Sequence, residues 1–128
     1  MRVVVTLGST APQATGQGVD TLIGIESLYG SNLDDKLTGD AGNNSISGGL
    51  GNDTLDGGGG IDTANFLFGE DFVRITTGVT VSLAAGTSSN ATLGEDRLRN
   101  FENLVTGDGG DSVTGSAAAN YILTQAGD

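Results

Sequence analysis

The chain has 128 residues, of which 23 are glycine, and its sixteen acidic and five basic side chains give a formal net charge of −11. It contains no cysteine, histidine or tryptophan, and aromatic residues make up only 5 %. This composition excludes disulfides and thiolate or imidazole metal sites, and the charge opposes binding to nucleic acid or anionic membranes while favouring cations.

The first predicted element is a half-buried strand at residues 3–7, where apolar and other side chains alternate. Its apolar run is too short for a secretory signal. The sequence contains no run of eighteen apolar residues that would predict a membrane-spanning helix, so we expect no membrane insertion.

The next segment is built from nine-residue repeats. Residues 48–65 read GGLGNDTLD and GGGGIDTAN, which is the pattern G-G-x-G-x-D-x-U-x written twice, with U a small or apolar residue. The same register extends back to residue 21 and gives five consecutive nonads. We predict a glycine turn and a three-residue strand in each nonad, with the middle strand residue pointing inward, and no helix. The sixth positions are Glu26, Asp35, Asn44, Asp53 and Asp62, and the eighth positions are Leu28, Leu37, Ile46, Leu55 and Ala64.

Two nonads then complete one coil of a two-sided solenoid, so that residues eighteen apart lie in adjacent coils on the same edge. Asp35 lies over Asp53 and Asn44 over Asp62, about one strand spacing (~4.8 Å) apart. A cation between such carboxylates removes their repulsion, and glycine turns leave backbone carbonyls free to join it. Ca²⁺ accepts six to eight oxygens, whereas Mg²⁺ demands stricter geometry and zinc or copper prefers nitrogen and sulfur. The residues therefore favour calcium.

After the nonads, residues 66–68 and 72–75 carry most of the bulky side chains, and we predict a cap or bend there. A shift of 76 residues then aligns the rest of the chain with its beginning, for example Val79 with Val3 and Asp111 with Asp35. We predict a first module at 1–76, with calcium-binding nonads at 21–65, and a second, degenerate and truncated module at 77–128. We expect the array to continue beyond residue 128, and the open strand edges predict end-to-end self-association.

The tandem nonads resemble the RTX, or haemolysin-type calcium-binding, family. The resemblance implies a right-handed parallel β-roll, or β-solenoid, in which the sixth-position Asp of repeats n and n+2 bind calcium together with turn carbonyls. It implies one strong site and one weaker site, because Asn44 lacks a charge, and no calcium at Glu26 or Glu102. The strong site comprises Asp35 and Asp53 with carbonyls near Ser31, Leu33, Gly48 and Leu50; the weaker comprises Asp62 and Asn44 with carbonyls near Asp40, Gly42, Gly57 and Gly59.

The sequence thus predicts a calcium-binding structural module of a larger exported bacterial protein, without a catalytic site, that folds when one or two ions bridge its coils. The resemblance implies an extracellular location reached by the type I route. One alternative is a calcium-independent β-solenoid serving as an adhesin or scaffold segment. Another is a noncatalytic module of an exported hydrolase or epimerase. The simplest competing interpretation of the aspartates is that they are ordinary turn residues.

Overall fold

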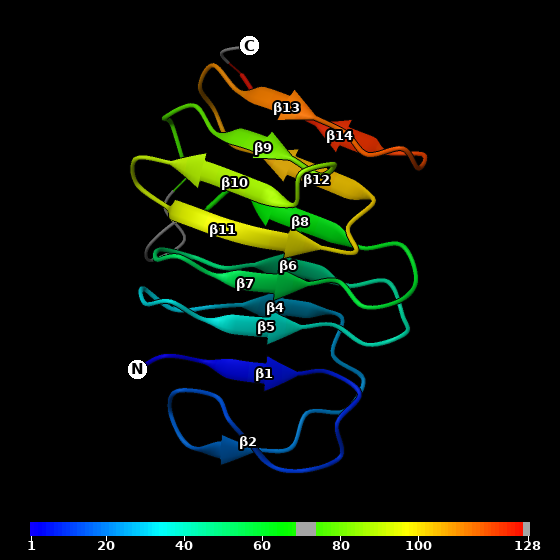
Figure 1. Ribbon diagram of the computed structural model, residues 1–128. Coiled ribbons are helices and arrows are strands. Elements are labelled where there is room, and N and C mark those ends of the chain that lie inside the picture. The colour runs from blue at the N-terminus through cyan, green and yellow to red at the C-terminus, as the bar shows by residue number, and fades with distance from the viewer. Residues whose placement is uncertain (69–73, 127–128) are drawn as a thin grey trace.

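A computed structural model describes residues 1–68 and 74–126, and among these residues it contains strands and turns but no helix, so none that could cross a membrane. Figure 1 shows the strands stacked into a column, with the N-terminus towards one end and the C-terminus at the other. The strands are β1 (Val4–Thr6), β2 (Gln13–Ala14), β3 (Val19–Asp20), β4 (Ser27–Tyr29), β5 (Lys36–Thr38), β6 (Ser45–Ser47), β7 (Thr54–Asp56), β8 (Thr63–Phe66), β9 (Thr80–Ser82), β10 (Thr87–Asn90), β11 (Gly94–Arg99), β12 (Asn103–Thr106), β13 (Ser112–Thr114) and β14 (Tyr121–Leu123).

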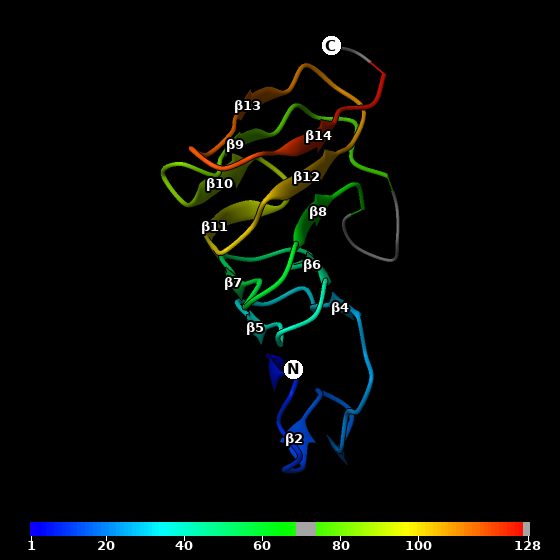
Figure 2. The same ribbon diagram turned by 90° about the vertical axis from the view of Figure 1, so that its right-hand side faces the viewer.

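Two sheets form the opposite sides of the column, as the view in Figure 2 shows. One has seven strands in the order β1-β5-β7-β11-β10-β9-β13, and the other has five in the order β14-β12-β8-β6-β4. Strands β2 and β3 form a separate antiparallel hairpin near the N-terminal end. The prediction of an all-β chain with parallel strands is confirmed.

The nonads occupy β4 to β8, and successive nonads alternate between the two sheets. Lys36 pairs with Thr54 in one sheet and Ser45 pairs with Thr63 in the other, both in parallel register and eighteen residues apart. The predicted spacing of eighteen residues between paired strands is therefore confirmed. The middle residue of each strand points inward as expected, and Leu37, Ile46, Leu55 and Ala64 are all buried.

The core is a narrow stack of these inward side chains. Because each coil contributes only about two of them, no single coil buries enough apolar surface to fold alone, and stability depends on its neighbours. Phe66 and Ile75, the first and last residues of the predicted cap, are also buried. Residues 72 and 73 of this cap lie outside the described residues.

The second half of the described chain repeats the strand pairs of the first half at an offset of 76 residues. Val5 pairs with Leu37 between β1 and β5, and Val81 pairs with Val113 between β9 and β13. Strands β4 and β6 likewise correspond to β12 and β14.

The antiparallel part of the larger sheet differs from the all-parallel roll predicted from the sequence. Strand β10 lies between β9 and β11 and pairs antiparallel with both, and β11 then joins β7 in parallel. Residues 87–90 read TSSN, which lacks the apolar alternation that marks a half-buried strand. This inserted meander places β11 directly above the last nonad strand of its sheet.

Candidate metal centre

A ladder of acidic side chains runs along one edge of the column. One carboxylate oxygen of each aspartate accepts a hydrogen bond from a backbone N–H in the coil below it. The Oδ1 atom of Asp35 accepts from Val3 N at 2.6 Å, that of Asp53 from Asp35 N at 2.8 Å, and that of Asp96 from Asp53 N at 2.9 Å. These bonds hold each carboxylate between two successive turns.

A second ladder runs along the opposite edge. The Oδ1 atom of Asp62 accepts from Asn44 N at 2.7 Å, and Glu102 Oε2 accepts from Asp62 N at 2.9 Å. Both ladders satisfy buried backbone donors that the strands themselves leave unpaired.

The two tandem nonads differ from the turn of Asp35 in whether the second carboxylate oxygen, Oδ2, has a hydrogen-bond partner. Within the described residues, the Oδ2 atoms of Asp53 and Asp62 are buried and have no hydrogen-bond partner, and each aspartate is only 1 % exposed. By contrast, Asp35 Oδ2 accepts from Ser31 N, and its Oδ1 also accepts from the Ser31 hydroxyl.

The second residue of the turn explains this difference. Ser31 and Asp40 occupy that place in the earlier nonads, and each donates its N–H to the side chain four residues later. In the tandem nonads the place is taken by Gly49 and Gly58, whose φ angles are +96° and +94°. Glycine adopts this left-handed conformation readily, and here its N–H does not reach the carboxylate.

The spaces beside the unpartnered oxygens are closely lined by other oxygens. A Cβ added to Gly48 would lie 2.0 Å from Asp53 Oδ2, and one added to Gly49 would lie 2.3 Å from the Ser31 carbonyl oxygen. On the opposite edge, a Cβ on Gly57 would lie 2.7 Å from Asp62 Oδ2, and one on Gly58 would lie 2.2 Å from the Asp40 carbonyl oxygen. The turns are therefore narrow cradles of oxygen atoms that only glycine leaves open.

Burial makes the charges in these cradles costly. Burial, together with the nearby carboxylates of Asp96 and Asp35, raises the pKa of Asp53 to about 7, against the opposing hydrogen bond from Asp35 N. Burial, followed by the charge of Glu102, likewise raises the pKa of Asp62. The ion pairs among the described residues, Arg74 with Asp108 and Arg99 with Asp56, lie elsewhere on the surface. At neutral pH these two buried carboxylates need a proton or a bound cation.

The kind of cation follows from the donor set. No three acidic side chains converge at one point in the described part of the chain, so an ion would take most of its ligands from backbone carbonyls. A site made only of carboxylate and carbonyl oxygens suits a hard cation such as Ca²⁺.

Comparison with known families agrees with this chemistry. The model of the RTX calcium-binding nonapeptide repeat matches four copies, at residues 29–64 and 101–128, which together make up half of the chain. The chain belongs to this RTX family. RTX nonapeptide repeats bind Ca²⁺ and form a calcium-binding structural module. No curated protein and no solved structure matches the chain.

The RTX turns bring the residues named in the sequence analysis close to one another, with two differences in detail. Most of the predicted ligand carbonyls lie beside a glycine of the facing turn, namely those of Ser31, Leu33, Asp40, Gly42, Gly48 and Gly57. The other two residues, Leu50 and Gly59, donate their backbone N–H to a carbonyl of the facing turn. Asp35, however, already uses both carboxylate oxygens. Asn44 Oδ1 accepts from Asp40 N, and its buried Nδ2 has no acceptor among the described residues.

Asp96, which continues the Asp35–Asp53 ladder, was not predicted as a site residue, and neither was the contact of Glu102 with Asp62. A signal for Asp96 was present, because residues 93–96 read LGED and residues 50–53 read LGND. Gly94 and Gly51 share positive φ angles of +104° and +113°. The separation of 43 residues, instead of eighteen, concealed the match.

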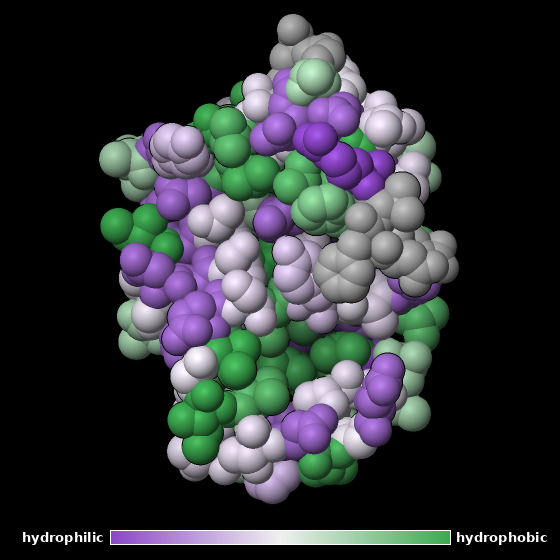
Figure 3. All heavy atoms as spheres, turned by 180° about the vertical axis from the view of Figure 1, so that it is seen from behind, coloured by the Kyte–Doolittle hydropathy of each residue, from purple (hydrophilic) through white to green (hydrophobic). Residues whose placement is uncertain are grey.

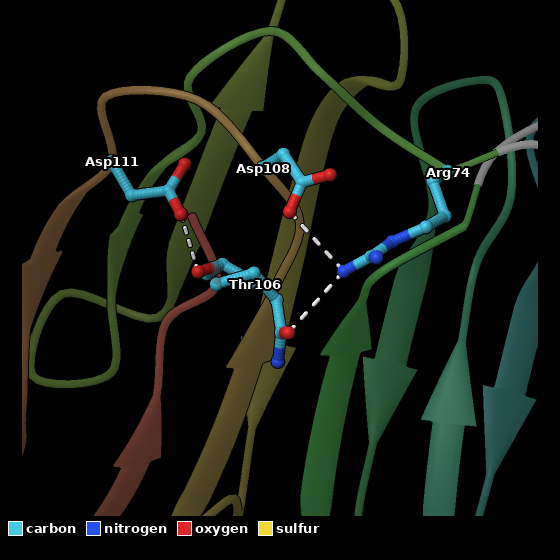
Figure 4. Close-up of polar contacts among 5 residues, drawn as sticks. Arg74, Thr106, Asp108 and Asp111 are labelled. Atoms are coloured by element: carbon cyan, nitrogen blue, oxygen red, sulfur yellow. Dashed lines mark hydrogen bonds and ion pairs between the residues drawn. The ribbon is translucent and has the colours of Figure 1, made fainter. Parts of the chain in front are cut away.

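In the second half of the chain, the corresponding turns are satisfied by the protein itself. Asp111 accepts from Val79 N at 2.8 Å and from the Thr106 hydroxyl, beside the Arg74–Asp108 ion pair (Figure 4). The Oδ1 atom of Asn120 accepts from Ser116 N, and its Nδ2 donates to the Glu102 carbonyl and to the Ser116 hydroxyl. These turns bury no unpartnered carboxylate oxygen.

Proposed function

We propose that this chain is a calcium-dependent structural module of a larger exported protein, and that its folding is coupled to calcium binding. The observation that carries the proposal is the pair of buried, unpartnered carboxylate oxygens of Asp53 and Asp62 in oxygen-lined glycine turns. Without calcium, these charges and the net charge of −11 oppose the compact state. With calcium, each ion replaces the lost hydration of a carboxylate and ties two turns together.

In this proposal the first ion lies between the turns of Asp35 and Asp53, and the second between those of Asn44 and Asp62. Turn carbonyls complete both sites. The Asn44 amide brings a buried N–H₂ group instead of a second carboxylate, so the second site binds more weakly. Each ion present at a hundred times its dissociation constant adds about 2.7 kcal/mol to stability.

A scaffold role is favoured for residues 77–128, which we propose bind no calcium themselves and fold upon the coils that calcium stabilises. Asp111 accepts hydrogen bonds through both carboxylate oxygens, and the Asn120 amide is also hydrogen-bonded, whereas the Oδ2 atoms of Asp53 and Asp62 have no partner among the described residues. Bound calcium then stabilises the coils of residues 30–65, while residues 77–128 extend the solenoid as a scaffold.

We further propose that the coils wind as a right-handed parallel β-roll and that export follows the type I route. Family membership supports both. The parent protein then supplies any catalytic, adhesive or transport activity, and this segment supplies its extracellular folding.

Circular dichroism with and without EDTA tests the coupling, and native mass spectrometry counts the ions. We expect a disordered spectrum in EDTA, a β spectrum in millimolar calcium, and one or two ions per chain. An unchanged β spectrum in EDTA with no bound ion would favour the calcium-independent solenoid for the whole chain.

A further inference from the structure

Three of the five basic residues of this acidic chain lie on one face of the molecule. Lys36, Arg97 and Arg99 belong to β5 and β11 of the seven-stranded sheet, and all three are exposed on its outer face. By contrast, the strands of the five-stranded sheet contain no charged residue. Figure 3 shows that opposite side of the column, where hydrophobic and weakly polar atoms occupy much of the centre. Positive charge is therefore concentrated on one face of a chain whose net charge is −11.

The strand register places two of these cations on either side of a threonine. Lys36 pairs with Thr54, and Thr54 pairs with Arg97, so the three side chains form a row across β5, β7 and β11. The row continues beyond Arg97 to the hydroxyl residues Thr87 and Ser82 of β10 and β9. The backbones of Lys36 and Arg97 are two strand spacings, or ~9.6 Å, apart. Both long side chains can therefore reach a group that lies over Thr54.

The row borders an open hollow of about 580 Å³, which is also lined by Thr38, Asp56 and Arg99. Arg99 forms an ion pair with Asp56 at 4.0 Å, whereas neither Lys36 nor Arg97 forms one within the described residues. Strands β5, β7 and β11 are interior strands of their sheet, with β1 on one side and β10 on the other. Further coils at either end of the column would therefore leave this hollow open.

We propose that this hollow binds a carboxylate group of an acidic polysaccharide between Lys36 and Arg97. The Arg97 guanidinium offers two parallel N–H donors, which match the two oxygens of a carboxylate. Lys36 Nζ adds a charge-assisted hydrogen bond from the other side, and the Thr54 hydroxyl lies in the row between them. The hydroxyls of Thr87 and Ser82 then provide donors and acceptors for the sugar hydroxyls of a chain that runs along the column.

The lining of the hollow favours a sugar chain over other acidic polymers. Leu55 and Leu98 are buried in the core, so the exposed side chains of the hollow are charged or carry hydroxyls, and it lacks the aromatic and apolar anchors of protein interfaces. Its strands are already paired on both edges, which leaves no edge for an added peptide strand. Nucleic acid requires a larger basic surface than three cations provide on a chain of net charge −11. A carboxylated sugar chain needs only the hydrogen-bonding groups that this face presents.

The test is an NMR titration of the whole chain in millimolar calcium with hyaluronan oligosaccharides, in which a uronic acid alternates with a neutral sugar. The proposal depends on the stacked strands and not on the ions themselves. Circular dichroism therefore checks the fold of each sample, and a chain that also folds without calcium is titrated in the same way. We expect shifts of the backbone amides centred on Lys36, Thr54 and Arg97, with a dissociation constant of the order of 10⁻⁴–10⁻³ M that rises with salt. A folded chain whose amides do not shift overturns the proposal.

Variants of the two cations assign the site. Lys36→Gln and Arg97→Gln remove one charge each at exposed strand positions, so the fold is retained and binding weakens about fivefold or more. Arg97→Lys keeps the charge but loses the paired donors, and its affinity falls between those of the unmodified chain and Arg97→Gln. The matched control is Arg74→Gln, which changes the net charge equally at an exposed ion pair away from this face and leaves binding unchanged. Equal affinities of Arg97→Gln and the control overturn the assignment.

Three further ligands test the chemistry of the partner. Methyl esters of the same oligosaccharides lack the carboxylate charge, and we expect them to cause no shift at Lys36 or Arg97. Short dextran sulfates carry sulfate on a sugar chain, and oligoglutamate carries carboxylates on a peptide; we expect both to bind more weakly. Undiminished binding of the methyl esters, or tighter binding of the sulfated sugar or of the peptide, overturns the proposal of a carboxylated polysaccharide.

Discussion

Replacing Asp53 by asparagine is expected to change stability in opposite directions with and without calcium. Burial raises the pKa of this carboxyl from 3.8 to about 7, so its ionised form costs the calcium-free fold of the order of 4 kcal/mol at pH 7.5. Asparagine removes that charge, and its oxygen can still accept from Asp35 N. In EDTA we therefore expect the calcium-free fold to gain about 1–4 kcal/mol.

In calcium the same variant loses a ligand. At a calcium concentration a hundred times the dissociation constant, it forfeits about 2.7 kcal/mol. Urea unfolding followed by circular dichroism measures stability in calcium. In EDTA, a titration with trimethylamine N-oxide measures how much osmolyte is needed to fold the chain, because this osmolyte favours compact states.

Asp35→Asn is the matched control, because Asp35 is placed in the same ladder but both of its oxygens are already hydrogen-bonded. An asparagine cannot accept at both positions, so we expect a loss of about 1–3 kcal/mol even in EDTA. If Asp53→Asn also lost stability in EDTA, the unpartnered-charge argument for Asp53 would be wrong.

Three further predictions concern the same turns. The raised pKa of Asp53 means that protonation favours the calcium-free fold; this stabilisation is largest below the ordinary pKa of 3.8 and is lost as the pH rises through about 7. Circular dichroism in EDTA should therefore show more β structure at pH 5 than at pH 8, and the reverse order would contradict the assignment. Gly48→Ala places a Cβ 2.0 Å from Asp53 Oδ2 and is expected to weaken calcium binding at least about tenfold by calorimetry. Gly59→Ala, whose added Cβ has its nearest neighbour at 3.7 Å, should change stability by no more than about 0.5 kcal/mol, and equal effects of the two changes would argue against the cradle. Asn44→Asp supplies a second carboxylate beside Asp62, so the weaker ion should bind about tenfold more tightly, and an unchanged calorimetric titration would count against a site there.

The nonad part of the fold follows from the sequence because its period is short and successive units repeat the same pattern of turn, acidic and apolar positions. Once Asp53 and Leu55 are placed in one unit, their counterparts follow at intervals of nine, and the eighteen-residue coil sets the register. The meander at β9 to β11 could not be predicted in this way. Its strand β10 is polar on both faces, and the pairing of β11 with β7 follows a segment that breaks the nine-residue period.

The candidate site was predicted less completely than the fold. The sequence indicates which turns face each other, but not which carboxylate oxygens are left over after local hydrogen bonding. Asp35 and Asp53 are the same residue at the same position of the repeat. They differ because Ser31 donates to Asp35, whereas Gly49 adopts a positive φ angle and does not donate to Asp53.

The stacking of the coils also determines how the molecule responds to a pulling force. The hydrogen bonds between neighbouring strands run along the column, so tension between the two ends opens them one after another and does not shear them all together. Each opened coil releases eighteen residues, or about 60 Å of extended chain. An ion between two turns acts as a local clasp that must open before the next coil can leave. The column should therefore lengthen in discrete steps, and if calcium binds as proposed, the coils of residues 30–65 are expected to open last.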